Sequence, residues 1–417
     1  MAVNVIAIDD IAIEDEYENS DESTDLTDEK EIISFYFHRG FHYKEILNFL
    51  QKFHHKEMSL STLKRRIKGY GLQRKNSDYD LDIVRDTIRS LLDGPGCCRG
   101  YRAMWHALQM RGITVPRVVV AELLRELDPE GVQERSRHKL KRRVYRNPGP
   151  NFSWHCDGYD KLKPYGFPIH GCIDGWSRKI LWLYVTRSNN QPNNIGMYYL
   201  EAVQQYNGCP VDFITDLGTE NGLAAAIHTF FRNDPDSHRY VSSPCNQRIE
   251  GWWSFLRKDQ TSWWMNFFKD LVEEGTLNLT LTLHTECLWF CFASLLQENL
   301  NEVKENWNSH SIRKSRYDTL QGRPDSLFYL PEFHNGLSNL HLPVPEEEIN
   351  YGREHIISDY SGQNDYQRYF TYIMDSCSLE KPSHWRDALE LFHVLINCAN
   401  NGDLEVETSS TSSFHSC

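Results

Sequence analysis

Three acidic residues stand in short segments whose residue types suit metal-assisted cleavage and joining of phosphodiesters. Asp157 lies in WHCDGYD, Asp216 in FITDLGTENG and Glu250 in NQRIEGWW. Hard divalent cations prefer oxygen ligands, and two of them bound together can activate an attacking hydroxyl and stabilise a leaving oxygen. We therefore predict that these three carboxylates are catalytic and bind two Mg²⁺ or Mn²⁺ ions.

Spacing alone leaves a second interpretation open. The chain has 58 acidic residues, so any three of them could be ordinary surface charges. Four further acids lie close to the same segments in sequence: Asp160, Asp174, Asp212 and Glu220. The eleven cysteines are dispersed and form no CxxC pair, so no cluster of Cys and His competes for the metal ion.

Polar residues beside the second and third acids are candidates for binding the substrate phosphate or shaping the loop around it. These residues are Glu220, Asn221, Asn246, Gln247 and Arg248. An arginine at such a place can make two parallel hydrogen bonds to a phosphate group. Asn246 and Gln247 are equally suited to capping a helix that carries Glu250, and both interpretations stay open.

The pattern from residue 151 onward predicts the elements that must hold these acids. Strands are expected at NFSWHCDGY, GFPIHGCID, KILWLYVT, VDFITD and HRYVSS, with helices after the third, fourth and fifth. The order βββαβαβα is typical of an α/β fold with a mixed sheet flanked by helices. Asp157 would end the first strand, Asp216 would end the fourth, and Glu250 would lie near the start of a long helix. The tryptophans expected in the core or an interface are Trp252, Trp253, Trp263 and Trp264.

Residues 31–77 are expected to form a helix-turn-helix-like DNA-binding unit. Its last helix, within SLSTLKRRIKGYGL, has a candidate N-cap at Ser59 or Ser61 and a basic face. The candidate DNA contacts on this face are Lys64, Arg65, Arg66 and Lys68. In a helix-turn-helix the second helix lies in the major groove of DNA. A solvated basic helix in an ordinary bundle would have the same pattern.

Two further segments separate this unit from the α/β region. Residues 78–134 predict a second helical unit, in which Arg102 and Arg117 are candidate phosphate contacts. Residues 135–150 predict a basic linker that ends in the turn sequence NPGP. The candidate DNA contacts in the linker are Lys139, Lys141, Arg142 and Arg143. Such a run is typical of a nuclear-localisation signal or of a segment that follows phosphates, and a flexible charged linker is the alternative.

Charge is distributed unevenly along the chain, although the net charge is −13. Residues 1–30 have a net charge of −10, whereas residues 31–150 have +11, which favours a nucleic-acid partner for the basic part. We expect 1–30 to be a disordered acidic tail. We expect 331–417 to be an acidic region with one or two helices and a disordered Ser/Thr-rich end. The longest apolar run, CLWFCFASLL, is too short to span a bilayer, so no membrane partner is expected.

The segment 151–330 resembles the integrase core of the retroviral-integrase superfamily, and more narrowly the integrase-core proteins derived from transposons. The matching pieces are WHCDGYDKL, IHGCIDGWSRKI, TDLGTEN, NQRIEGWW and ENWNSHSIRKS followed by GRP. The resemblance implies a ribonuclease H-like fold with a five-stranded sheet, whose catalytic acids fall on Asp157, Asp216 and Glu250. The upstream pattern GYRxMWxxLxxRGIxVPR is similar to the helical segment ahead of the core in many bacterial insertion-sequence transposases.

Two features depart from the retroviral pattern. The interval from Asp216 to Glu250 is 34 positions, slightly shorter than is usual, and the connecting loop can absorb the difference. The zinc-binding HHCC unit is missing, because His38 and His42 have the histidine spacing but no CxxC pair follows. The helical units at 31–128 would have to replace it.

The resemblance implies a DDE-type DNA strand transferase, which hydrolyses a DNA end and joins the freed 3′-hydroxyl to a target strand. Its implied partners are transposon ends, target DNA and further copies of the chain, because two DNA ends are handled together. A nuclear location is expected. Two alternatives stay open: a domesticated, non-catalytic nuclear DNA-binding protein derived from a transposon, and a ribonuclease H-like nuclease that acts on RNA–DNA hybrids.

Overall fold

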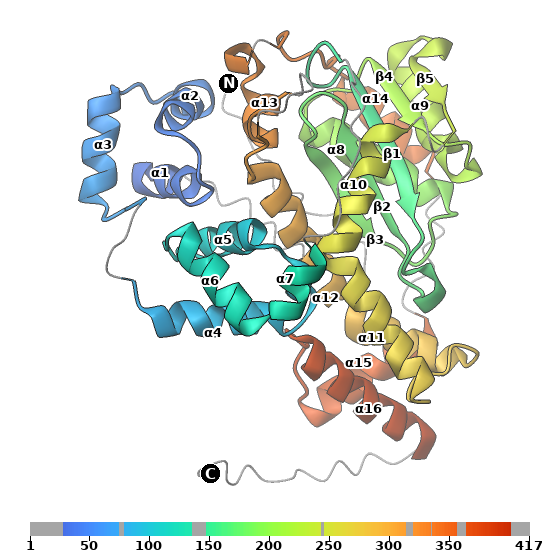
Figure 1. The fold of residues 1–417 in the computed structure, drawn as a ribbon. Helices are drawn as coiled ribbons and strands as arrows, with labels where there is room; N and C mark the ends of the chain where they lie inside the picture. Colours follow the sequence, from blue (N-terminus) through green and yellow to red (C-terminus); the bar gives the residue numbers. More distant parts are fainter. Residues whose placement is uncertain are drawn as a thin grey trace.

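The computed structural model has a central α/β unit with helices before and after it (Figure 1). The residues it describes are 28–74, 79–135, 147–242, 246–313, 320–334, 336–356 and 364–401. The predicted tail up to residue 27, the Ser/Thr-rich end and most of the basic linker lie outside these ranges. The same holds for four of the candidate DNA contacts: Lys139, Lys141, Arg142 and Arg143.

Five strands form one mixed sheet in the order β3-β2-β1-β4-β5. Their bounds are β1 Ser153–Tyr159, β2 Ile169–Asp174, β3 Ile180–Val185, β4 Asp212–Thr215 and β5 His238–Tyr240. Strand β1 is antiparallel to β2 and parallel to β4. Because β1 and β4 are parallel neighbours, Asp157 near the end of β1 and Asp216 directly after β4 lie toward the same edge. The expected fold class is confirmed, and the sheet is ribonuclease H-like.

The two faces of the sheet are covered by different helices, because side chains alternate along each strand. Trp154 and Cys156 of β1 face a core formed with α8 (Pro192–Gln205) and α9 (Gly222–Arg232). Tyr159, and with it Asp157 two residues earlier, faces the opposite core, which is formed with helices that follow β5 in the chain. The strand therefore directs Asp157 toward the helix that carries Glu250.

The helices on this second face are α10 (Gln247–Leu256), α11 (Ser262–Glu273) and α12 (Thr282–Ser309). The sequence predicted one long helix from residue 246 onward, but a π-helical turn, Arg257–Thr261, separates α10 from α11. This turn is largely buried. The expected burial of the tryptophans is confirmed for Trp252, Trp253 and Trp264, which are at most 5% exposed, while Trp263 is partly buried.

Seven helices precede the sheet within the described residues. Their bounds are α1 Glu29–His38, α2 Tyr43–His54, α3 Leu60–Gly69, α4 Leu81–Leu92, α5 Tyr101–Met110, α6 Arg117–Leu127 and α7 Pro129–Arg135. Ser59 is the N-cap of α3, since its Oγ accepts a hydrogen bond from Thr62 N at 3.1 Å. Helices α1–α3 share one apolar core that also contains Leu330, whereas α4–α7 form another.

Four α-helices follow α12: α13 Pro324–Tyr329, α14 Glu346–Glu354, α15 Asp365–Cys377 and α16 Trp385–Asn401. Three of them lie in 331–417, so the expectation of one or two helices there was wrong. Short 3-10 helices lie at Pro95–Cys98, Lys163–Tyr165, Thr219–Asn221, Pro235–Ser237 and Pro331–His334. Among the helices that the structure describes, none has both the length and the apolar character to cross a bilayer.

Candidate active site

Asp157 is a buried carboxylate on β1, only 7% exposed. Its Oδ2 accepts a hydrogen bond from Trp253 Nε1 at 3.0 Å. Burial raises the pKa of Asp157 to about 7, the hydrogen bond from Trp253 opposes this shift, and the negative charges of Glu250 and Asp216 add to it. The first predicted acid is therefore held in place by a helix and lies within the electric field of the other two.

Asp216 lies in the loop directly after β4. Its Oδ1 accepts hydrogen bonds from Asn221 Nδ2 at 2.8 Å and from Gly218 N at 3.2 Å, which fixes the carboxylate against the following turn. The Glu220 side chain lies directly over Gly218, since a Cβ at residue 218 would lie 2.0 Å from Glu220 Oε1. Asn221 thus orients the second acid, and the Glu220 carboxylate lies against the same loop.

Glu250 lies in the first turn of α10 and is half-buried. Burial raises its pKa, the negative charge of Asp216 raises it further, and the positive charge of Lys161 lowers it. Each of the three predicted acids therefore interacts electrostatically with the other two, although they come from a strand, a loop and a helix. Among the described residues, no three His, Cys, Asp or Glu side chains have the spacing of a formed metal site.

The chemistry of the donors nevertheless fits a divalent cation. Asp157, Asp216 and Glu250 offer only carboxylate oxygens, the ligands that Mg²⁺ and Mn²⁺ prefer. The negative charges that raise the pKa of Asp157 and Glu250 would be neutralised by a cation bound between them. The site thus has the ligand type and the charge for such a cation.

The alternative acids near the site have other partners. Asp174 is fully buried and accepts hydrogen bonds from the backbone of Asn151 and Ser177, both at 2.7 Å, so it holds a turn. Asp160 pairs with Lys163 at 3.0 Å and lies on the surface. A third alternative, Asp212, pairs with an arginine on the neighbouring strand β5. These contacts separate the alternatives from the three coupled acids.

Asn246 does not lie where the sequence suggested. Its side chain is fully buried: Oδ1 accepts a hydrogen bond from His155 Nδ1 at 2.8 Å, and Nδ2 donates to Cys156 O at 2.8 Å. Although it is the N-cap residue of α10, its side chain makes no capping hydrogen bond. Both the expected phosphate contact and the capping alternative are therefore corrected: Asn246 fastens the start of α10 to β1.

Gln247 and Arg248 follow in the first turn of α10, and both are partly exposed. The positive charge of Arg248 helps to lower the pKa of His155, which burial alone already brings down, to about 4. Arg248 therefore lies near the start of β1, beside the helix turn that carries Glu250.

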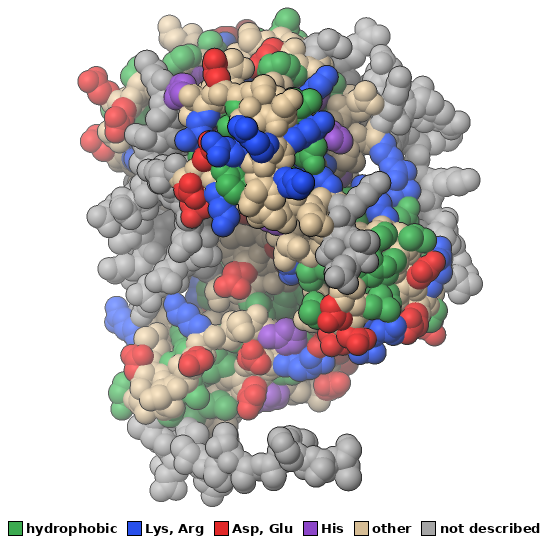
Figure 2. Space-filling model, turned by 90° about the vertical axis from the view of Figure 1, so that its left-hand side faces the viewer, with side chains coloured by type: hydrophobic (Ala, Val, Ile, Leu, Met, Phe, Trp, Pro, Cys, Tyr) green, Lys and Arg blue, Asp and Glu red, His purple; other side chains and the backbone are tan. Residues whose placement is uncertain are grey.

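The candidate DNA contacts on α3 lie on one exposed face. Lys64, Arg65 and Lys68 are exposed, while Leu63 and Ile67 are buried on the opposite side of the helix. Lys and Arg side chains gather over the upper part of this side of the molecule, where α1–α3 lie (Figure 2). The remaining candidate on α3, Arg66, pairs instead with Glu29 of α1 at 2.9 Å.

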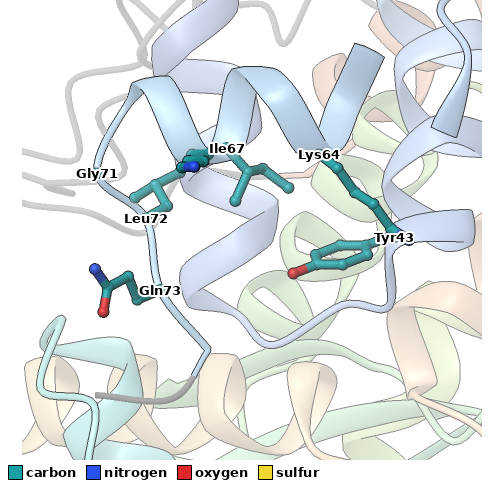
Figure 3. Close-up of a pocket in the computed structure, with 7 residues that line it drawn as sticks. Tyr43, Lys64, Ile67, Gly71, Leu72 and Gln73 are labelled. Atoms are coloured by element: carbon teal, nitrogen blue, oxygen red, sulfur yellow. The ribbon is translucent and has the colours of Figure 1, made fainter. Parts of the chain in front are cut away.

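A shallow cavity of about 340 Å³ lies beside this face. Its lining residues are Tyr43, Lys64, Ile67, Lys68, Gly71, Leu72 and Gln73. Figure 3 shows Lys64 of α3 extending toward Tyr43 at the start of α2. The cavity and the basic face are therefore continuous through Lys64 and Lys68.

A second basic cluster joins α5 and α6 to the chain that follows α12. The guanidinium of Arg117 lies 3.9 Å from the ring centre of Trp105, and Arg102 Nε donates to Tyr101 OH at 2.9 Å. Burial lowers the pKa of Arg117, and the nearby charges of Arg313 and Arg102 lower it further. The sequence singled out Arg102 and Arg117 as phosphate contacts. Arg313 lies within the matching piece ENWNSHSIRKS but was not singled out, because only the fold brings it close to them.

Comparison with known families agrees with this geometry. Residues 144–330 match the family described as Integrase core domain. No curated protein matches the chain. The matched segment contains the whole sheet, all three coupled acids and helix α12. This match supports an integrase core domain of the retroviral-integrase superfamily at residues 144–330.

Proposed function

We propose that this protein is a metal-dependent polynucleotidyl transferase of the DDE type, which cleaves a DNA end and joins its 3′-hydroxyl to a target strand. The main support for this proposal is that Asp157, Asp216 and Glu250 lie close enough at one edge of the sheet to interact electrostatically. These three residues would hold two Mg²⁺ or Mn²⁺ ions, which supply activation of the attacking hydroxyl and stabilisation of the leaving oxygen when bound.

The other residues of the site have positioning roles in this proposal. Asn221 orients the Asp216 carboxylate, and Asn246 fixes the start of the helix that carries Glu250. Arg248, partly exposed in the same turn as Glu250, would contact a phosphate of the substrate. Nuclear location and self-association stay predictions that follow from the resemblance.

Two basic surfaces support a nucleic-acid substrate. One is the exposed face of α3, with Lys64, Arg65 and Lys68. The other is the cluster of Arg102, Arg117 and Arg313, in which guanidinium groups lie near one another. None of these three arginines forms an ion pair with an acid in the part of the chain that the structure describes. Phosphates of a DNA backbone would neutralise both surfaces.

The test is a strand-cleavage and strand-transfer assay with Mg²⁺ or Mn²⁺ on duplex DNA, RNA–DNA hybrid and RNA. Asp216→Asn should lower activity on duplex DNA by at least about 100-fold, because it removes a ligand charge. Asp160→Asn is the matched control, since this exposed acid lies three positions after Asp157 and should retain activity. Equal activity of the wild type and Asp216→Asn would refute the proposal, and a preference for hybrid would favour the nuclease alternative.

The acidic ends of the chain favour a second candidate, a non-catalytic DNA-binding protein, because residues 1–30 alone have a net charge of −10 that opposes contact with phosphate. Calorimetric titration with Mn²⁺ separates the two candidates. Metal binding that disappears in Asp157→Asn and Asp216→Asn supports the transferase. DNA binding without any metal binding that depends on these acids supports the second candidate.

A further inference from the structure

Trp253 occupies a position on α10 that depends on a glycine in the sheet. Asp157 of β1 and Gly171 of β2 are directly opposed in the antiparallel register, so both belong to the same face of the sheet. A Cβ at residue 171 would lie 2.8 Å from Trp253 Cη2. The absence of a side chain at Gly171 therefore leaves the space in which the indole of Trp253 lies.

The position of the indole is further restricted by its neighbours. Trp253 is 5% exposed, and its ring centre lies 5.1 Å from that of Tyr159 and 5.2 Å from that of Trp252. In this orientation its only polar atom, Nε1, donates to Asp157 Oδ2 at 3.0 Å. An indole has a single donor and no acceptor, so the hydrogen bond selects the carboxylate orientation that presents Oδ2 to the ring.

Glu250 and Trp253 lie three residues apart on α10, and residues at this spacing are neighbours on one side of a helix. The hydrogen bond from Trp253 therefore ties the helix that carries the third acid to the strand that carries the first.

We propose that Trp253 is a positioning residue for the candidate metal site: its indole N–H orients Asp157, and Gly171 provides the room for it. This inference rests on the proposed function, because it assigns Asp157 to a divalent cation. Hydrogen-bond partners of metal-binding carboxylates commonly change metal affinity by about 10- to 100-fold when removed. Trp253 acts through Asp157 and does not contact the substrate.

Trp252 provides a matched control on the same helix. It is 2% exposed, and its Nε1 has no hydrogen-bond partner among the described residues. Trp252→Phe and Trp253→Phe each remove one buried indole N–H and retain an aromatic ring, but only the second removes a contact with Asp157. A comparable pair of glycine variants is Gly171→Ala, which displaces the indole, and Gly251→Ala, whose Cβ meets nothing within 4 Å.

The experiment is calorimetric titration of the full chain with Mn²⁺, together with thermal unfolding of every variant. We expect Trp253→Phe and Gly171→Ala to weaken Mn²⁺ binding by about 10-fold or more. Trp252→Phe and Gly251→Ala should bind as the wild type does. A second measurement uses ¹⁵N-labelled tryptophan: the indole signal that is missing in Trp253→Phe should shift when Mg²⁺ is added to the wild type.

The outcomes separate this inference from the proposed function. Wild-type affinity in Trp253→Phe, combined with lost affinity in Asp157→Asn, overturns the role of Trp253 and leaves the metal site intact. Equal affinity in the wild type and Asp157→Asn overturns the metal site itself, and the role of Trp253 with it. If Trp252→Phe weakens binding as much as Trp253→Phe does, the effect comes from packing, and the inference is again wrong.

Discussion

The carboxylate of Asp157 has a different environment from those of the acids near it in sequence. Asp174 is satisfied by backbone and hydroxyl donors of its own turn, and Asp160 lies on the surface beside Lys163. Asp157 instead accepts hydrogen bonds from the Trp253 indole and the Gly158 backbone, has no positively charged partner among these contacts, and faces two further negative charges. A buried carboxylate with so little compensation is costly for stability alone, and such sites are commonly functional.

Asn246 gives a prediction at the scale of one residue. Asn246→Ala should lower the free energy of unfolding by about 2–4 kcal/mol, because it removes the buried hydrogen bonds of Asn246 with the ring of His155 and the carbonyl of Cys156. Urea unfolding measures the effect. Gln247→Ala, at the partly exposed next position, should change it by less than about 0.5 kcal/mol. Equal effects of the two variants would contradict the anchoring role.

The sequence singles out Asp157 and Asp216 as candidates, but it does not indicate the contacts of Asn246 and Trp253. Asp157 and Asp216 were predictable because each ends an apolar segment that reads as a strand. The role of Asn246 depends on His155, which is 91 positions away in the chain, and that of Trp253 depends on the β1–β2 register opposite Gly171. Both contacts are set by tertiary packing, which local patterns do not specify.

At the scale of elements, the π-helical turn Arg257–Thr261 joins the integrase core to the preceding helical unit. Arg99 is only 2% exposed. Its Nε lies 3.6 Å from Oδ2 of Asp259 in this turn, and its Nη1 lies 2.9 Å from Oε1 of Glu302 on α12. A π-helical turn contains one extra residue, and it often occurs at functional positions. In this turn Asp259 is buried, and Arg99 is its positively charged partner.

Arg99→Met should therefore destabilise the protein by about 3–5 kcal/mol, because it leaves Asp259 and Glu302 without their buried positive partner. Denaturant unfolding measures the loss. Arg111, more exposed and 3.3 Å from the same Glu302, is the matched control, and Arg111→Met should cost less than about 1 kcal/mol. Similar losses for both variants would show that burial of Arg99 is unimportant.

Helix α3 gives a prediction about DNA. Replacing Lys64, Arg65 and Lys68 by Glu should weaken binding to duplex DNA. The slope of log affinity against log salt concentration should become smaller in magnitude by about three, because each of these residues releases roughly one counterion when it contacts a phosphate. Fluorescence anisotropy at several salt concentrations measures this slope. A triple variant with an unchanged slope would exclude α3 from the interface, while Arg89→Glu on α4 is the control that should leave it unchanged.

Element prediction from the sequence succeeded where periodicity was strong. The five strands and helices α1–α6 follow from apolar spacing, Gly breaks and the Ser59 cap. Three of the described α-helices lie after residue 330, where one or two were expected. Helix α14, EEEINYGRE, has few apolar residues, and the apolar face of α15 is covered by packing on α12. The π-helical turn could not be predicted, since its residues have no local pattern that distinguishes it from an α-helix.

At the scale of the whole molecule, several imidazoles are buried in the neutral form. Burial lowers the pKa of each of them to about 3 or 4: His106, His170, His228 and His310. Their folded-state pKa lies below the unfolded value of about 6.5, so the unfolded chain binds protons first as the pH falls. The stability that they contribute is present above pH 6.5 and is lost toward pH 4.

Thermal unfolding at pH 7.5 and pH 5.0 should therefore show a clearly lower midpoint temperature at pH 5.0. Below pH 6.5, each buried imidazole should lower the free energy of unfolding by about 1.4 kcal/mol per pH unit. His228, bonded to Tyr199 OH at 2.6 Å, is the residue to test. His228→Gln should reduce the difference between the two pH values, and the exposed control His393→Gln should not. A midpoint independent of pH would contradict the prediction.

Helices α15 and α16 pack on α12, where Phe370 and Phe392 are almost completely buried in the core shared with α11. A premature stop codon soon after residue 330 would spare every proposed catalytic acid and still uncover this apolar strip. We expect such a shortened product to aggregate or to be degraded. Recombinant fragments should accordingly extend at least to Asn401 if they are to remain monodisperse.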